Sequence, residues 1–504
     1  MRSRELARIA ATAVAGLSIS LQLAAQQHPL AQHHQYKLID IGTFGGPNSR
    51  VPLGEFVLVF PAVINNHGAV VGGADTSSPD PYCLDGAECY VAHAFQWDAG
   101  IRADLGALVQ SRNSSAEWIS PNGLIAGFSE NGEFDPLLGF TELRAVLWRN
   151  GRIIDLGTLP EGGYESWANA VNSKGEVVGW ATNTVADPNS MTAGIGNAQQ
   201  TRAFLWQKGS MRDLGTLGTG TDAIAQFIDE RGQVFGWSYT GAQGSGSCAG
   251  GAFPMAVDSF IWDDEHGMRD LGTFGGTCTL ALAVSQDGSV VGLSSNEQEL
   301  SRAFVWKKGS MQDLGGSIGG QQATATAINE SGQIVGFATL AGEVGAHAAL
   351  WKRPGEITDL GTPDPSECSM ALSINARTQI VGQSVDCVAF GSIHALLWDN
   401  GSLFDLNDLI PPGAALTLQF AENINDTGEI AGQGLDASGN LHAFLLIPCD
   451  AEHSNVAGCD YSLVDTRSEV RLSITLHESR RTPNAPRERA AQSDRRRSSL
   501  WLNK

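Results

Sequence analysis

The chain has 504 residues, of which 60 are glycine and 17% are charged, and its formal net charge is −22 at pH 7. A negative charge of this size repels phosphate backbones, which excludes nucleic acid as an expected partner. Many glycines together with few charged residues are typical of an all-β protein with many tight turns.

Residues 1–25 are predicted to form a signal peptide. Three arginines precede a run of small and apolar residues that ends at Ala25, and this run is short for a membrane span. An uncleaved anchor is the alternative interpretation of the same residues. With cleavage after Ala25 and a linker over residues 26–35, we expect a secreted protein, extracellular or periplasmic, without a transmembrane segment.

A unit of four short strands recurs over residues 36–448. In its clearest copy, the runs Arg302–Trp306 and Met311–Leu314 are followed by a hairpin of residues 323–328 and 333–339. We call these strands c, d, a and b respectively, because a blade that starts at its hairpin runs in the order a, b, c, d. Strand-length runs separated by Gly and Asn clusters indicate antiparallel β structure.

The turn between strands a and b has the same chemistry in every copy. Its first residue is Asn, Asp or Ser, which favour the first position of a type I turn, and glycine follows three residues later in all copies except one, where Thr378 stands. The turns begin at Asn65, Ser120, Asn172, Asp229, Ser285, Asn329, Asn375 and Asn425.

A second glycine lies inside strand b of every copy. Glycine weakens a strand, so its recurrence predicts a close approach of a neighbouring backbone or of an inner wall near the ring axis. These glycines are Gly72, Gly127, Gly179, Gly236, Gly292, Gly336, Gly382 and Gly432.

The two ends of the repeat region are complementary. Residues 36–42 match strand d alone, whereas the last copy ends with strand c at residues 442–446 and has no strand d. Eight copies of roughly 52 residues each fit four-stranded propeller blades. The sequence therefore predicts an all-β fold, an eight-bladed β-propeller of four-stranded antiparallel blades, closed by pairing of the N- and C-terminal strands. Seven blades are the alternative.

The repeated pattern also resembles a known family. The combination of an HAFLW-like strand, a DLGTLGG-like strand and an IN..G.VVG-like hairpin is plainest at residues 202–218 and 302–336. It resembles the HAF repeat of bacterial extracellular proteins, over about four-fifths of the chain. The resemblance implies secretion and a propeller-like repeat protein, and it implies no reaction.

The eight cysteines are an even number in a chain with a predicted signal peptide, which favours disulfides. No CxxC or Cys/His spacing supports a metal cluster instead. The tail, residues 449–504, is predicted to begin with a disulfide and then to be a disordered, Arg- and Ser-rich segment. Pairing in sequence order is expected: Cys83–Cys89, Cys248–Cys278, Cys368–Cys387 and Cys449–Cys459.

The chain has no HExxH, phosphate-binding P-loop or EF-hand pattern. We therefore predict no catalytic residue, no metal ligand and no cofactor. The eight strand-d aspartates are expected to hydrogen-bond backbone N–H groups between strands. The seven strand-c tryptophans are expected to pack between blades. A ring of strand-c histidines as metal ligands is disfavoured, because Arg202 and Arg302 occupy the same position and guanidinium is no ligand.

The b–c and d–a loops share one face of the predicted propeller, and the b–c loops vary most in length, so this face is the candidate binding face. Tyr164, Trp167 and Tyr239 lie in or near it and are the predicted ligand-stacking residues. We expect a monomeric binding or scaffolding propeller for a glycan, peptide or surface partner. The alternative is a propeller-fold glycan lyase or hydrolase whose acids come from the loops. The candidate acids are Glu161, Glu165, Asp222 and Glu297.

Overall fold

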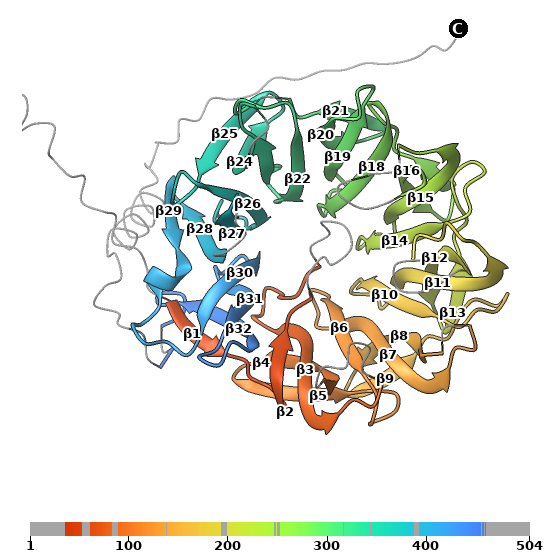
Figure 1. Cartoon of the computed structure of the whole chain (residues 1–504), viewed down its shortest axis with the longest axis horizontal. Helices are drawn as coiled ribbons and strands as arrows, with labels where there is room; N and C mark the ends of the chain where they lie inside the picture. Colours follow the sequence, from red (N-terminus) through yellow and green to blue (C-terminus); the bar gives the residue numbers. More distant parts are fainter. Residues whose placement is uncertain are drawn as a thin grey trace, which may run out of the picture. The chain divides into compact units, whose positions relative to one another are not determined.

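A computed structural model describes residues 36–459, except 53–60, 83–88, 138, 193–198, 246–247, 249–252, 316, 343–344, 388–392, 455 and 458. The predicted signal peptide and linker, and the tail beyond residue 459, lie outside the described residues. Within them, the strands form eight four-stranded antiparallel blades in a ring (Figure 1). The predicted fold class is thus confirmed, and the four strands of each blade pair in the order a, b, c, d.

Blades 1 to 4 follow one another along the chain, and each uses four consecutive strands. Blade 1 consists of β2 (Gly45–Arg50), β3 (Val70–Pro79), β4 (Tyr90–Asp98) and β5 (Ile101–Gly106), and blade 2 of β6 (Ser114–Ile119), β7 (Ile125–Phe134), β8 (Thr141–Arg149) and β9 (Arg152–Asp155). Blade 3 consists of β10 (Ser166–Val171), β11 (Val177–Ala186), β12 (Gln199–Gln207) and β13 (Ser210–Asp213). Blade 4 consists of β14 (Ala223–Ile228), β15 (Val234–Gln243), β16 (Met255–Asp263) and β17 (Gly267–Asp270).

Blades 5 to 7 continue this arrangement, and blade 8 takes its fourth strand from the start of the chain. Blade 5 consists of β18 (Gly275–Val284), β19 (Val290–Asn296), β20 (Ser301–Lys307) and β21 (Ser310–Asp313), and blade 6 of β22 (Ala323–Ile328), β23 (Ile334–Thr339), β24 (Ala346–Arg353) and β25 (Glu356–Gly361). Blade 7 consists of β26 (Glu367–Ile374), β27 (Ile380–Asp386), β28 (Ile393–Asp399) and β29 (Ser402–Asp405), and the 3-10 helix η2 (Leu406–Leu409) follows it. Blade 8 consists of β30 (Thr417–Ile424), β31 (Ile430–Leu435), β32 (Leu441–Pro448) and β1 (Tyr36–Asp40).

The ring closes through the two terminal strands, as predicted. β1 pairs antiparallel with β32, with Leu38 opposite Leu446 and Tyr36 opposite Pro448. In Figure 1 the red strand β1 lies beside the blue strand β32. Blade 8 also contacts blade 1 through Asn425, whose side-chain Nδ2 donates to the Asn65 carbonyl at 3.1 Å. The closed ring leaves no long sheet edge without a partner at the ends of the repeat array.

The strand-b glycines lie against the backbone of strand a in the same blade. Of the two predicted causes, the close approach of a neighbouring backbone therefore applies, and not an inner wall near the ring axis. A Cβ atom placed on Gly336 would overlap the Thr324 carbonyl oxygen and lie 2.9 Å from the Ala325 Cα. The register of the two strands shifts between Ala325 and Ala327, so strand a bulges toward the glycine at this point. The equivalent glycines of the other seven blades meet the carbonyl of strand a in the same way.

The strand-c tryptophans pack between blades. Trp351 of blade 6 is fully buried, and its indole N–H donates to the Gly315 carbonyl at the end of strand d in blade 5 at 3.1 Å. Trp148 and Trp398 make the same contact with the preceding blade. A buried indole needs a hydrogen-bond acceptor, and the glycine-containing end of strand d supplies its carbonyls there.

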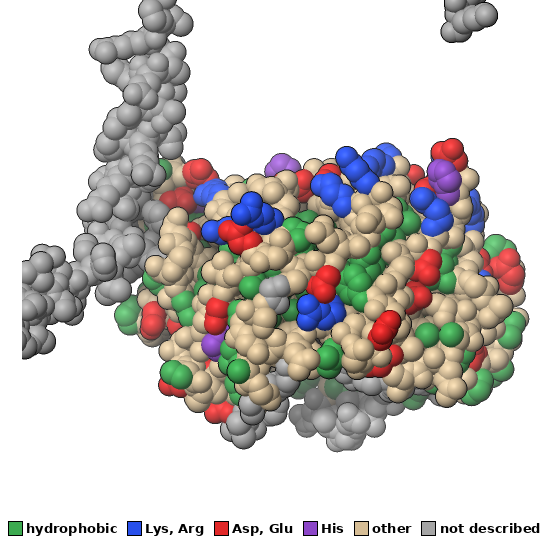
Figure 2. Space-filling view, turned by 90° about the horizontal axis from the view of Figure 1, so that it is seen from above, with side chains coloured by type: hydrophobic (Ala, Val, Ile, Leu, Met, Phe, Trp, Pro, Cys, Tyr) green, Lys and Arg blue, Asp and Glu red, His purple; other side chains and the backbone are tan. Residues whose placement is uncertain are grey.

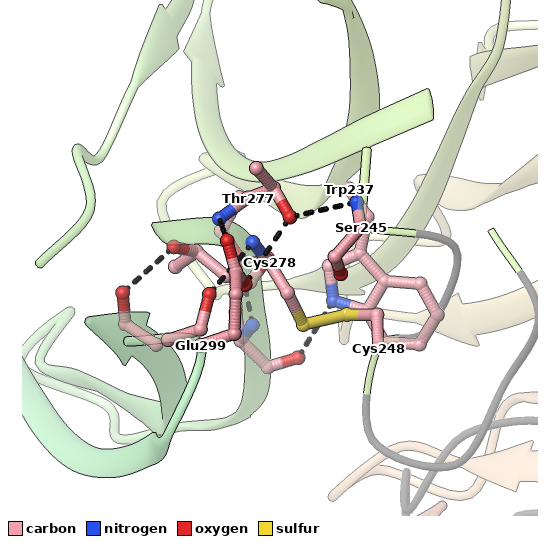
Figure 3. The surroundings of a disulfide bond; sticks show 11 residues. Trp237, Ser245, Cys248, Thr277, Cys278 and Glu299 are labelled. Atoms are coloured by element: carbon pink, nitrogen blue, oxygen red, sulfur yellow. Dashed lines mark hydrogen bonds between the residues drawn. A yellow bond between two sulfur atoms is a disulfide. The ribbon is translucent and has the colours of Figure 1, made fainter. Parts of the chain in front are cut away.

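Three of the four expected disulfides are present: Cys248–Cys278, Cys368–Cys387 and Cys449–Cys459. Cys83 lies outside the described residues, so its pair with Cys89 stays a prediction. Cys248 belongs to the b–c loop of blade 4 and Cys278 to strand a of blade 5, so this bond links two blades. Figure 3 shows its surroundings, where Ser245 N donates to the Thr277 hydroxyl at 3.1 Å.

Candidate functional site

A cleft of about 570 Å³ lies at the b–c/d–a face of the ring. In blade 1 it is lined by the last residues of β2, the middle of β3 and the start of β4. In blade 2 it is lined by the start of β6, the middle of β7 and the start of β8, and blades 3 and 8 add further residues. This is the face with the long b–c loops. The lining residues used below are Asn48, Arg50, Gly73, Asp75, Asn113, Ser115, Phe128, Glu130 and Trp167.

The cleft lies at a position where four other blades carry an aromatic side chain. The residue after the strand-b glycine is aromatic in four blades, at Phe128, Trp180, Trp237 and Phe337, but it is Gly73 in blade 1. A Cβ on Gly73 would meet only ordinary contacts, the nearest being Ser115 Oγ at 3.5 Å. The backbone therefore does not require glycine at this position. We call the space the Gly73 cleft.

Aromatic rings form the apolar wall of the Gly73 cleft. Phe128 and Trp167 come from adjacent blades, and their ring centroids lie 3.9 Å apart at an interplanar angle of 29°. Trp180 continues the stack at 6.2 Å from Trp167 and 14°. A stacked set of this kind holds each ring in one orientation and presents a fixed apolar surface.

Carboxyl and amide groups form the polar wall. Asp75 Oδ2 accepts hydrogen bonds from the backbone N–H and the side-chain amide of Asn48, both at 3.0 Å. Glu130 Oε1 accepts from the Asn113 side-chain amide at 3.1 Å. Burial raises the pKa of both carboxyls, and the hydrogen bonds from Asn48 and Asn113 oppose that shift without cancelling it. Arg50 adds one cationic side chain to the lining.

The structure brings one of the three predicted stacking residues to the cleft. Trp167 lines it, whereas Tyr164 is half-exposed and is not a lining residue. Tyr239 is 1% exposed and packs edge-to-face on Phe253 at 6.5 Å. Its backbone pairs with Val257, because strand b of blade 4 extends to Gln243, and this places Tyr239 in the core between blades. The site residues that sequence reasoning missed are Gly73, Asp75, Phe128 and Glu130; comparing the residue after each strand-b glycine would have singled out Gly73.

The four candidate acids do not meet at one site. Glu161 and Glu297 are exposed. Glu165 and Asp222 are buried immediately before strand a of their blades, where each accepts a backbone N–H from strand c of the preceding blade. Glu165 Oε2 accepts from Leu143 at 2.7 Å, and Asp222 Oδ1 accepts from Thr201 at 3.1 Å. These carboxyls join adjacent blades and do not line the cleft.

The strand-d aspartates also have a structural role. Asp313 Oδ1 accepts the N–H of Gly315 at 2.7 Å, so its backbone bond lies within its own turn and not between strands. In six blades the same aspartate also pairs with the Arg or His that begins strand c, at N–O distances of 2.8 to 3.0 Å. The pairs are His93–Asp104, Arg202–Asp213, Arg302–Asp313, His347–Asp359, His394–Asp405 and His442–Asp40.

Stability is expected to fall as the pH rises from about 5 to about 8. Burial raises the pKa of Glu165 and Glu422 to about 8 and that of Asp222 to about 7. A carboxyl whose pKa is higher in the folded chain stabilises the fold fully below its unfolded pKa, and this contribution disappears as the pH rises through the folded pKa. The melting temperature should therefore drop by on the order of a few degrees over this range, as measured by calorimetry.

Glu422→Gln provides the test of this pH dependence, because the amide does not ionise. This variant should show a flatter profile than the parent, whereas Glu161→Gln, at an exposed position, should follow the parent. A Glu422→Gln profile parallel to that of the parent would show that ionisation of Glu422 does not limit stability.

Among the described residues, no three His, Cys, Asp or Glu side chains gather as they would around a metal ion. The same residues contain no helix with the length and apolar character needed to cross a membrane. Along the part of the rim visible in Figure 2, acidic and basic side chains lie side by side without one continuous basic surface.

The sequence matches no family model and no curated protein. Solved structures with some likeness include the Pyrococcus horikoshii acylaminoacyl peptidase, with 11% identity and a TM-score of 0.40, over 68% of this chain and 52% of that one. A puromycin-hydrolyzing peptidase of Mycobacterium tuberculosis has 13% identity and a TM-score of 0.41, over 78% and 62%. The β-propeller domain of the Trilobed protease from Pyrococcus furiosus has 12% identity and a TM-score of 0.39, over 72% and 100%.

The chain thus spans between about half and two thirds of the length of the two peptidases. At these identities and TM-scores the likeness carries no activity over to this protein. The propeller fold is established by the strand pairing within the chain itself.

Proposed function

We propose that this protein is a secreted binding propeller that holds a glycan in the Gly73 cleft. The observation that carries the proposal is the meeting of a stacked aromatic wall with amide and carboxyl groups across one cleft. Sugar rings present C–H groups that pack on aromatic side chains, and they present hydroxyls that both donate and accept hydrogen bonds. Carboxylates and side-chain amides match those hydroxyls.

The charge of the cleft favours a neutral glycan. Asp75 and Glu130 are two acidic groups against the single cation of Arg50. The chain as a whole carries a net charge of −22. An anionic sugar chain would therefore meet a repulsive potential, whereas a neutral one is recognised by hydroxyl contacts alone.

Secretion and membership of the HAF-repeat family belong to the same proposal. Disulfide-bonded cysteines are compatible with an extracellular or periplasmic location, where such bonds persist. The eight blades are consistent with the repeat that the resemblance rests on, because strand c, which begins with Arg or His in seven blades, lies beside the aspartate-containing strand d in every blade.

A glycan hydrolase is the second candidate, because Asp75 and Glu130 both have raised pKa values and line the same cleft. A protonated carboxyl is what a general acid requires. Binding is favoured over hydrolysis because each carboxyl already accepts hydrogen bonds from an asparagine, which holds it in a structural role.

Gly73→Trp is expected to weaken glycan binding strongly without unfolding the protein. An indole at this position would occupy the cleft, as Trp180 and Trp237 occupy the equivalent positions of blades 3 and 4. After a glycan-array screen of the parent identifies a bound sugar, calorimetric titration should show binding weakened about tenfold or more. Gly73→Ala is the matched control and should bind like the parent, because its Cβ makes only ordinary contacts.

The outcomes separate the candidates. A Gly73→Trp variant that folds and binds the sugar as well as the parent would place the site outside the cleft. Cleavage of the bound sugar by the parent, lost in Glu130→Gln, would establish the hydrolase instead of the binding protein.

A further inference from the structure

Blade 4 departs from the charge pattern of the other seven. The residue that begins strand c is Arg or His in every other blade, and in blade 4 it is Asp258. The aspartate of strand d is retained as Asp270. Blade 4 therefore places two acidic side chains where the other blades place one acid and one base.

The backbone geometry shows that Asp258 takes the place of the missing cation. Asp258 lies two residues before Phe260, and Phe260 pairs with Asp270. His93 of blade 1 likewise lies two residues before the partner of Asp104. Asp270 Oδ1 accepts the N–H of Gly272 at 2.7 Å, the same turn contact that the other strand-d aspartates make. Its carboxyl is thus oriented as in the blades with an ion pair.

Asp258 is 9% exposed, and its Oδ1 has no hydrogen-bond partner. A buried carboxyl oxygen without a partner is unfavourable, and the like charge of Asp270 adds to the cost. Arg269, the residue before Asp270, pairs with Asp263. Arg212 of blade 3 pairs with Asp264 at 2.9 Å. Within the described residues, no basic side chain replaces the missing Arg or His.

We propose that a divalent cation, Ca²⁺ by its chemistry, binds between Asp258 and Asp270 and takes the place of the guanidinium or imidazole of the other blades. Hard carboxylate oxygens are the ligands Ca²⁺ prefers, and backbone carbonyls and water can complete its coordination. Asp270 is exposed, which gives an ion access from solvent. With two carboxylates, the affinity should lie near the 10⁻⁴ to 10⁻³ M of extracellular calcium modules, roughly the concentration outside cells.

The site lies beside the junction of blades 4 and 5. Val257, the neighbour of Asp258, pairs in parallel with Cys278 of blade 5, and this single bridge joins the two blades into one sheet. Cys278 is also the disulfide partner of Cys248 (Figure 3). A bound cation would therefore stabilise the junction that the disulfide already links.

The test uses the full chain after removal of metal with EDTA. Addition of Ca²⁺ to millimolar concentration at about pH 8 should raise the melting temperature by about 1–3 °C. Asp258→Asn, which keeps the size of the side chain, should lose this shift. Asp258→Arg restores the residue type of the other blades, and it should melt at or above the metal-free parent and not respond to Ca²⁺.

Two results would overturn the proposal. The first is a parent whose melting temperature and calorimetric titration show no response to Ca²⁺, which would show that no cation binds between the two carboxyls. The second is a Ca²⁺ shift that persists in Asp258→Asn, which would place the ion elsewhere. If Asp258→Arg fails to fold, Asp258→Asn alone decides between these outcomes.

Discussion

Replacing Gly72 with alanine is expected to destabilise the propeller far more than replacing Gly73, the next residue of the same strand. A Cβ on Gly72 would overlap the Arg50 carbonyl oxygen and lie 2.9 Å from the Phe95 ring. Neither neighbour can retreat freely, because the first is backbone and the second is fully buried. Overpacking of this kind costs about 1–3 kcal/mol, and more where backbone must move.

Gly73→Ala serves as the internal control for this comparison. Its Cβ would lie 3.5 Å from the nearest atom, and alanine reduces the freedom of the unfolded chain, so its stability should equal or slightly exceed that of the parent. Denaturant unfolding of both variants measures the difference. Equal stabilities would show that strand a can shift away from strand b, and the same reasoning would then fail for Gly336→Val in blade 6.

Deleting residues 36–40 is expected to open the ring. The deletion removes β1, which buries Tyr36 at 3% exposure and packs Leu38 against the core of blade 8. Burial of two such side chains contributes about 1.5–3 kcal/mol each. The deletion also leaves β32 as an unpaired edge, which favours association with other copies. A fall in melting temperature of about 5 °C or more is expected, with concentration-dependent oligomers in size-exclusion chromatography.

Asp40→Ala is the control that distinguishes the contribution of strand β1 from that of its ion pair with His442. This variant removes the contact with His442 but leaves the backbone pairing of β1 and β32 in place. It should remain monomeric and lose far less stability than the deletion, since ion pairs that are partly exposed contribute little. If the deletion variant melts like the parent and stays monomeric, closure by the terminal strands does not hold the ring together.

The architecture could be predicted because its information is local and repeated eight times. Asn329 and Gly332 specify their turn by chemistry that is visible within four residues, and the missing strand d of the last copy matches the lone strand at Tyr36. The Gly73 cleft could not be predicted from the sequence in the same way. It depends on what is absent at Gly73 and on rings that meet across blades, such as Phe128 and Trp167.

Tyr239 shows the second limit of sequence reasoning. The sequence predicts Tyr239 in or near the loop face, but strand b of blade 4 continues beyond it, and the Tyr239 side chain lies in the core. Strand ends are set by pairing with the next strand along the chain, here Val257, and that pairing is not encoded near Tyr239 itself.

The closing of blade 8 by both ends of the chain has a consequence for chain connectivity. Tyr36 lies opposite Pro448, so the start of β1 adjoins the end of β32 just as strands c and d adjoin in the other blades. Blade 7 joins those strands through Asn400 and Gly401, both with positive φ, which is the two-residue turn that fits a twisted hairpin. The same dipeptide placed between Pro448 and Tyr36 would make the ring covalently continuous. New termini could then be opened at the c–d turn of another blade, which gives a circular permutant that keeps all eight blades.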